Sequence, residues 1–178
     1  IEIARCDVAV PASVRGLAEQ VGERPVDVLI NNAGVMGRMQ SLEDLDLDDV
    51  ANTFSVNTLG PVRVVQALLP ALRRGKRRIV HVSSGMGSIT DNTSGGAYGY
   101  RISKAALNMA SRSMSVDLAG EGFVCVVMNP GWVQTDMGGK GAPVPVDESI
   151  RLLLERIDAL APEHNGAFLN YKGGSYAY

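Results

Sequence analysis

Short runs of β-branched residues, each ending in glycine, asparagine, serine or proline, constrain the fold more than any other feature of the chain. Five such runs predict strands, at residues 26–30, 78–82 and 123–128, and with a weaker pattern at 1–8 and 167–170. Segments with a helical period separate them, at 13–22, 46–57, 61–72, 99–119 and 147–160. Because parallel strands are joined through helices, this alternation predicts an α/β chain with a mostly parallel, Rossmann-like sheet and helices on both faces.

The length and composition fit one folded domain spanning residues 1–178. Hydrophobic residues make up 46% of the chain and charged residues 20%, which excludes a disordered chain. The net charge of -2 favours neither nucleic acid nor an anionic membrane as a partner, and no apolar run is long enough for a transmembrane segment. Cys6 and Cys125 have neither disulfide nor metal-ligand spacing, so we expect no metal and a reducing, cytoplasmic location.

Polar residues follow four of the predicted strands. They are Asp7, the segment 31–34 (Asn-Asn-Ala-Gly), the pair Ser83 and Ser84, and the segment 129–131 (Asn-Pro-Gly). The carboxyl ends of parallel strands meet at one edge of a sheet, where ligands bind. This convergence favours an enzyme.

Tyr100 and Lys104 are four residues apart at the start of a predicted helix, so both side chains can face one cavity. A free phenol has a pKa near 10, and lowering it by about two units takes roughly 2.7 kcal/mol of differential stabilisation, which a nearby ammonium can supply. A surface pair explains the spacing equally well when it is taken alone. Tyr98 lies six residues from Lys104, off the helical spacing.

Ser84 and Asn57 complete the candidate site. Ser84 either caps a turn or donates a hydrogen bond to a carbonyl; His81 lies inside the preceding strand and His164 in a distant loop, so no Ser-His-Asp arrangement is indicated. Asn57 continues the apolar stripe of Val50 and Phe54, so it should be buried and hydrogen-bonded. It either satisfies backbone groups at a helix break before Gly60 and Pro61 or holds a water that relays protons, and the two roles are compatible.

Together these motifs resemble the short-chain dehydrogenase/reductase family. The motifs, in chain order, are Asn31-Asn32-Ala33-Gly34, Asn57 followed by Gly60, Ser84, Tyr100-xxx-Lys104 and Pro130-Gly131-xxx-Thr135. The resemblance implies hydride transfer between NAD or NADP and an alcohol or carbonyl substrate. It implies Tyr100 as general acid-base, Ser84 orienting the carbonyl, Lys104 lowering the tyrosine pKa and binding the nicotinamide ribose, and Asn57 completing a proton relay.

The resemblance also implies which residues would contact the cofactor. Asp7 and Val8 would flank the adenine, and Asn32, Ala33 and Gly34 would line the adenosine ribose side. Pro130 and Gly131 would open the loop in which Val133 and Thr135 contact the carboxamide. Tyr100 and Lys104 would lie against the nicotinamide ribose.

The chain departs from the family at its beginning. The first two strands and helices of the family fold, with the Thr-Gly-xxx-Gly-x-Gly turn that binds pyrophosphate, have no counterpart in the sequence. Glycines at 94–99 and 138–141 do not replace that turn, because neither follows the right strand and opens a new helix. This leaves open whether the chain binds the cofactor, and it predicts an unpaired edge beside residues 26–30. Either the domain is N-terminally incomplete, which the sequence favours, or the strand at residues 1–8 shifts to cover the edge, or another chain covers it.

One branch of the family, which contains C-factor-like developmental signals and small carbonyl reductases, is similar over residues 84–109 and 130–139. This similarity implies an alternative function: an intercellular signal that keeps the fold without efficient turnover, acting at the cell surface. The family also implies a homodimer through helices 61–72 and 99–119, which both carry apolar faces. The implied partners are therefore a small carbonyl or alcohol substrate and a second copy of the chain.

Overall fold

A parallel sheet forms the centre of the computed structural model, which describes residues 1–178. Its strands lie in the order β1 (Val28–Asn31), β2 (Arg78–Val82), β3 (Val124–Asn129) and β4 (Phe168–Asn170), and every neighbouring pair is parallel. Each strand runs in the same direction, so all four carboxyl ends reach one edge. The predicted parallel α/β architecture is confirmed, and its strands at 26–30, 78–82, 123–128 and 167–170 are placed within two residues.

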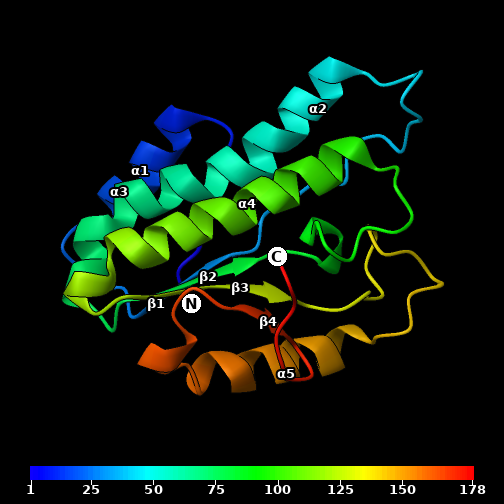
Figure 1. The fold of residues 1–178 in the computed structure, drawn as a ribbon. Helices are drawn as coiled ribbons and strands as arrows, with labels where there is room; N and C mark the ends of the chain where they lie inside the picture. The colour runs from blue at the N-terminus through cyan, green and yellow to red at the C-terminus, as the bar shows by residue number, and fades with distance from the viewer.

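Helices cover the two faces of the sheet unequally. On one face lie α1 (Pro11–Val21), α2 (Leu47–Phe54), α3 (Gly60–Arg74) and α4 (Tyr98–Asp117), whereas α5 (Val146–Asp158) lies alone on the other (Figure 1). The prediction of helices on both faces is confirmed. None of the helices combines the length and hydropathy needed to cross a bilayer.

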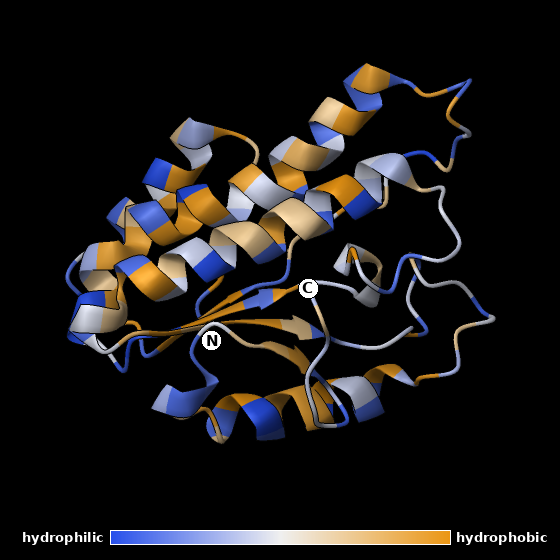
Figure 2. Cartoon of the chain, viewed as in Figure 1, coloured by the Kyte–Doolittle hydropathy of each residue, from blue (hydrophilic) through white to orange (hydrophobic).

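The core divides between the two faces because successive strand residues point to opposite sides. Ile79 and Cys125 pack with Leu68 of α3 on the face with four helices, whereas Val80 and Val126 belong to the cluster on the α5 face. Every residue of β3 is buried, and the strands are hydrophobic along most of their length (Figure 2). The central strands are therefore packed on both faces.

The predicted strand at residues 1–8 is wrong. The segment is irregular, with Ile1 and Ile3 exposed, and it ends in a turn in which Asp7 accepts a hydrogen bond from the Ala9 amide. Alternation alone does not make a strand, because backbone groups need a neighbouring strand to pair with. β1 is instead the edge of the sheet, and Ile30 is 41% exposed, as the predicted unpaired edge requires.

The predicted break before Gly60 and Pro61 is also wrong. A π-helical turn, Ser55–Leu59, joins α2 to α3 without interruption, and the Gly60 amide donates to Ser55 O. Pro61 has no N–H to donate to a carbonyl in the preceding turn. An α-helix would therefore lack one backbone hydrogen bond here, and the wider π-helical turn lies next to this position. The turn brings Asn57 fully inside, while Val50 and Phe54 remain half-buried.

Candidate active site

The first turns of α4 meet the end of β2, and this junction brings Tyr100 and Lys104 together. The Lys104 side chain is buried, its residue only 4% exposed, and its ammonium donates a 2.8 Å hydrogen bond to Val82 O at the end of β2. The same nitrogen lies 5.6 Å from the centre of the Tyr100 ring, which is 8% exposed. The two side chains thus occupy one side of the helix, as their spacing predicts.

Burial dominates the electrostatics of this pair. It lowers the pKa of Lys104 from 10.5 to about 8, because an ammonium is poorly solvated inside the protein. It raises the pKa of Tyr100 above its usual 10, and hydrogen bonding with Ser84 opposes that rise. The expected lowering of the tyrosine pKa by Lys104 is therefore wrong for the chain by itself: desolvation of the phenolate raises this pKa, and the opposing effect comes from Ser84.

Ser83 and Ser84 point to different partners, as expected for consecutive residues leaving a strand. The Ser84 hydroxyl accepts a hydrogen bond of 3.1 Å from the Met86 amide, so it does cap the turn, and it also faces Tyr100. Ser83 is buried and donates to Asn108 Oδ1 over 2.6 Å. Of the two serines, only Ser84 neighbours the phenol.

Asn57 connects three segments around the site. Its amide nitrogen donates to Val35 O over 2.8 Å and to Ser103 Oγ over 2.9 Å, and its oxygen accepts from the Val35 amide over 2.8 Å. Gly34 is close by, since a Cβ added there would lie 3.3 Å from Asn57 Oδ1 and 3.6 Å from Lys104 Nζ. The expected burial and backbone pairing of Asn57 are confirmed, and they fix the turn after β1 against α4.

Three buried residues that sequence reasoning did not assign also support the site. Ser103 donates to Tyr100 O and accepts from Asn57, and Asn108 pairs with Ser83. His81 Nδ1 lies 3.2 Å from the amide nitrogen of Asn31, and burial together with the charge of Lys104 lowers the pKa of His81 to about 4. The imidazole is therefore neutral and accepts the Asn31 hydrogen bond. The sequence offered one indication of this role for His81, its position inside the strand two residues before Ser83.

The residues expected to contact a cofactor lie where the chain leaves the strands. Asn32 and Ala33 are exposed and Gly34 half-buried directly after β1. After β3, Pro130, Gly131 and Val133 are half-buried and Thr135 is exposed. Asp7 and Val8 precede α1, where the Val8 side chain packs against the backbone of Gly60. The turns after β1 and β3 thus lie at the same edge of the sheet as the Tyr100 cluster.

The loop after β3 is ordered by its own contacts. A parallel bridge joins Val133 to Val144, and the Trp132 indole donates to Gly138 O over 2.8 Å. Trp132 is nonetheless 60% exposed and Met137 43% exposed. These two side chains present apolar surface on the loop that follows β3.

A nicotinamide ribose fits the donors of this site. An ammonium has three N–H groups, and Lys104 uses one on Val82 O, which leaves donors for ribose hydroxyls in a buried position. The pyrophosphate has no equivalent cradle in this chain. Residues 138–141 lie in the loop after β3, and residues 94–97 lead directly into α4, so neither forms a strand–turn–helix cradle.

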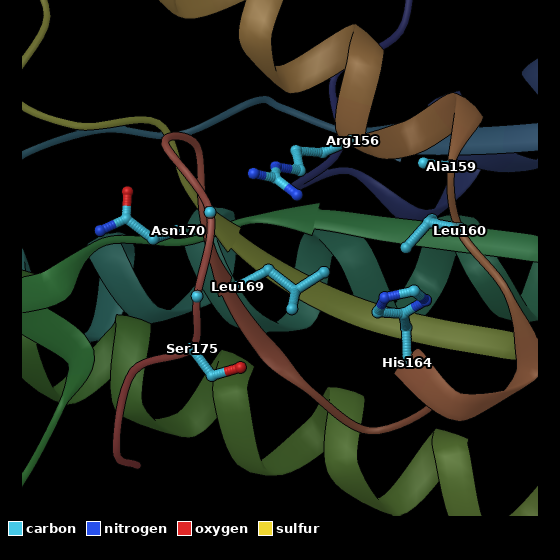
Figure 3. Close-up of a pocket in the computed structure, with 9 residues that line it drawn as sticks. Arg156, Ala159, Leu160, His164, Leu169, Asn170 and Ser175 are labelled. Atoms are coloured by element: carbon cyan, nitrogen blue, oxygen red, sulfur yellow. The ribbon is translucent and has the colours of Figure 1, made fainter.

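A separate hollow lies away from these residues, beside α5 and β4. Arg156, His164, Leu169 and Gly173 are among the residues that line it (Figure 3). None of the predicted catalytic or cofactor residues lines this hollow, and residues 173–175, which follow β4, form part of its wall. It is not the predicted substrate site.

A parallel Rossmann-like sheet, with a buried tyrosine–lysine pair and a serine at its carboxyl edge, is typical of oxidoreductases as a class. Comparison with protein families makes the class specific: residues 1–143 match the short chain dehydrogenase family. The chain belongs to this family.

Relatives from several organisms share the similarity. The C-signal of Myxococcus xanthus is 58% identical over 161 residues, covering 90% of this chain and 97% of the relative. The carbonyl reductase Sniffer of D. melanogaster superposes with a TM-score of 0.93 at 34% identity, covering all of this chain and 77% of that one. An NADPH-bound carbonyl reductase from chicken fatty liver gives 0.92 at 37% identity, covering 99% and 77%. The chain thus spans about three quarters of the length of both carbonyl reductases.

Proposed function

We propose that the chain is an NAD(P)-dependent reductase that interconverts a small carbonyl compound and its alcohol. The observation that carries the proposal is the buried cluster of Tyr100, Lys104, Ser84 and Asn57 at one end of the sheet. The similarity to carbonyl reductases, one of them described with bound NADPH, supports both the reaction and the cofactor.

Each residue has a role that its surroundings support. The Tyr100 hydroxyl gives its proton to the carbonyl oxygen as the alcohol forms, because burial keeps the phenol protonated at neutral pH. Ser84 donates a hydrogen bond to the same oxygen and fixes its orientation. Lys104 supplies positive charge next to the phenolate that remains, and Asn57 keeps α4 and the turn after β1 in register for proton return.

The cofactor supplies the hydride when it is bound. The proposal assigns Lys104 and Tyr100 to its nicotinamide ribose, Val133 and Thr135 to the carboxamide, and the turn of Asn32, Ala33 and Gly34 to the adenosine ribose side. Asp7 and Val8 would lie at the adenine, and Pro130 and Gly131 would open the carboxamide loop. These assignments concern the nicotinamide and adenosine ends of the cofactor, and none of them is to its pyrophosphate.

Tyr100→Phe is the direct test, with Tyr98→Phe as its matched control. Both tyrosines begin α4, but only Tyr100 faces Lys104. We expect Tyr100→Phe to lower the rate of NADPH oxidation with a panel of small aldehydes and ketones by about a hundredfold or more, the usual contribution of a general acid. Tyr98→Phe should keep most of the rate. Equal rates in the two variants would refute the assignment of Tyr100.

A signalling function is the second candidate, and the 58% identity to nearly the whole Myxococcus C-signal favours it. In this function the chain would act on other cells from the cell surface and would not need turnover. Purified chain carrying Ser84→Ala and Lys104→Met together would then restore development to cells that lack the gene. Loss of that activity in a double variant that still folds would show that signalling requires catalysis, which contradicts this second candidate function.

We also propose a homodimer and a cytoplasmic site of action for the enzyme. The apolar residues of α3, among them Val64, Leu68 and Leu72, are buried inside the chain, so the broad apolar face expected on helix 61–72 is not available outside. α4 does expose Ile102, Met109 and Val116. The proposed interface therefore centres on α4, and Met109→Glu should convert a dimer to a monomer in light scattering. A wild-type chain that is monomeric at micromolar concentration would exclude the dimer.

A further inference from the structure

Asn108 lies one helical turn beyond Lys104 on α4 and uses both ends of its buried amide. Its oxygen accepts the 2.6 Å hydrogen bond from Ser83 Oγ, and its nitrogen donates to Gly87 O over 3.2 Å. The side chain is almost completely enclosed, with 2% of the residue exposed. The amide therefore ties α4 to two points on the turn that follows β2.

Ser84 lies between those two points. Within the turn, the Met86 amide donates to Ser84 Oγ and the Gly87 amide donates to Ser84 O over 2.9 Å. The turn also approaches α4 so closely that a Cβ at Gly87 would come within 3.0 Å of Lys104 backbone carbon and 3.1 Å of Asn108 Nδ2. The position of Ser84 relative to α4 thus depends on contacts made on either side of it.

We propose that Asn108 is a positioning residue, which holds Ser84 at the distance from Tyr100 that carbonyl reduction requires. This inference rests on the proposed reductase function. Asn108 touches neither the phenol nor the expected substrate position, and it acts through Ser83 and Gly87 on the serine between them. Without it, two hydrogen bonds from α4 remain: Lys104 donates to Val82 O, two residues before Ser84, and Arg101 donates to Met86 O over a long 3.4 Å.

A control variant must separate this positioning role of Asn108 from the general effect of replacing a buried polar side chain on α4. Ser111, the next inward-facing polar residue of α4, is buried as deeply as Asn108, but its hydroxyl has no hydrogen-bond partner. Ser111→Ala is therefore a matched control for substituting a buried polar side chain on the same helix face. It should change neither the position of Ser84 nor the properties of Tyr100.

The test compares Asn108→Ala, Ser84→Ala, their combination and Ser111→Ala. The first readout is NMR titration of isotope-labelled tyrosine, with the Tyr100 signal assigned through Tyr100→Phe, because this readout needs no turnover. Since Ser84 opposes the rise in the pKa of Tyr100, we expect Asn108→Ala and Ser84→Ala each to raise that pKa, and the double variant to add little more. Ser111→Ala should leave it unchanged.

The second readout is carbonyl reduction. Asn108→Ala should lower kcat/KM about five- to tenfold, the loss expected for one misplaced hydrogen bond, while binding of NADPH stays at the wild-type level. If Asn108→Ala does not fold, Ser83→Ala removes the first anchor with a smaller change and should raise the pKa of Tyr100 in the same direction.

The proposal is overturned if both Asn108→Ala and Ser83→Ala leave the Tyr100 titration and the rate at their wild-type values. It is also overturned if the changes in the Tyr100 pKa caused by Asn108→Ala and Ser84→Ala add fully in the double variant, because Asn108 then acts independently of Ser84. An inactive wild-type chain whose Tyr100 titration still responds to Asn108→Ala would refute the reductase function and leave the positioning role standing.

Discussion

Replacing Lys104 with methionine should remove a pH-dependent loss of stability from the fold. The ammonium is buried beside Tyr100 with no carboxylate partner, and burial lowers its pKa from 10.5 to about 8. Each unit of pKa difference between the folded and unfolded states corresponds to about 1.4 kcal/mol, so keeping this lysine protonated in the fold costs about 3 kcal/mol at pH 7. Methionine has nearly the same length and carries no charge.

The pH range of the effect follows from proton binding. Below pH 8 both states hold the proton and the full cost is present. Between pH 8 and 10.5 the folded protein has released the proton while the unfolded chain still binds it, so raising the pH stabilises the fold. Above 10.5 both states are neutral and the cost is gone. The methionine variant lacks this whole contribution.

Methionine also leaves Val82 O without its side-chain donor, which opposes the gain by about 1–3 kcal/mol at every pH. The informative quantity is therefore the difference in unfolding free energy between wild type and Lys104→Met, measured by urea denaturation from pH 7 to pH 10.5. We expect the wild type to gain about 3 kcal/mol relative to the variant across that range. The buried thiol of Cys125, whose pKa burial raises to about 12, is present in both proteins, and its contribution cancels.

A difference that stays constant with pH would refute the reasoning, because it would mean that Lys104 is as well solvated in the fold as in the unfolded chain. Lys76→Met is a suitable control. Its ammonium is exposed beside Asp27, so its replacement should leave the pH dependence of the wild type in place.

Three further predictions concern stability. Burial and Lys104 lower the pKa of His81 from 6.5 to about 4, so between these pH values the unfolded chain binds a proton that the fold excludes. The unfolding free energy of the wild type should therefore fall by about 3 kcal/mol as the pH is lowered through this range. In urea denaturation at pH 7 and 4.5, His81→Gln should lose less unfolding free energy than the wild type. Gly75→Ala should destabilise the fold by about 2 kcal/mol or more, because its Cβ would lie 2.1 Å from Val26 O. A Cβ at Gly120 meets no atom within 4 Å, so Gly120→Ala should leave the stability unchanged, and thermal unfolding compares the two variants. Asp46→Ala removes the cap of α2 and should lower the unfolding free energy by about 1 kcal/mol in the same assay, and no change would show that the cap is dispensable.

The sequence predicted the sheet well where strands are buried on both faces. β2 and β3 are continuous apolar runs bounded by polar turns, and their positions follow from that pattern. The same reasoning failed at residues 1–8, where the alternation is present but no neighbouring strand is. A strand is a property of a pair of segments, and a period measured along one segment does not reveal its partner.

The candidate site was predictable to the extent that it depends on local spacing. Tyr100 and Lys104 lie one helical turn apart, and their proximity follows from the helix alone. The partners of Asn57 and His81 are separated from them by 46 and 50 residues, so only the assembled fold shows that they pair with Ser103 and Asn31. The direction of the Tyr100 pKa was missed for the same reason, because it depends on how completely distant segments enclose the ring.

The buried polar residues of α4 are not those that would make the fold most stable. Ser103, Lys104, Asn108 and Ser111 are all buried, at positions where an apolar side chain would pack without hydrogen-bonding requirements. A buried cation without an anion, and a hydroxyl without a partner, both weaken the fold. Such departures from an apolar pattern are expected where a helix serves a site, because fixed donors and acceptors hold one arrangement where apolar contacts would allow several. Three of these residues, Ser103, Lys104 and Asn108, make hydrogen bonds to Asn57, to the end of β2 and to the turn after it, whereas Ser111 makes no such bond.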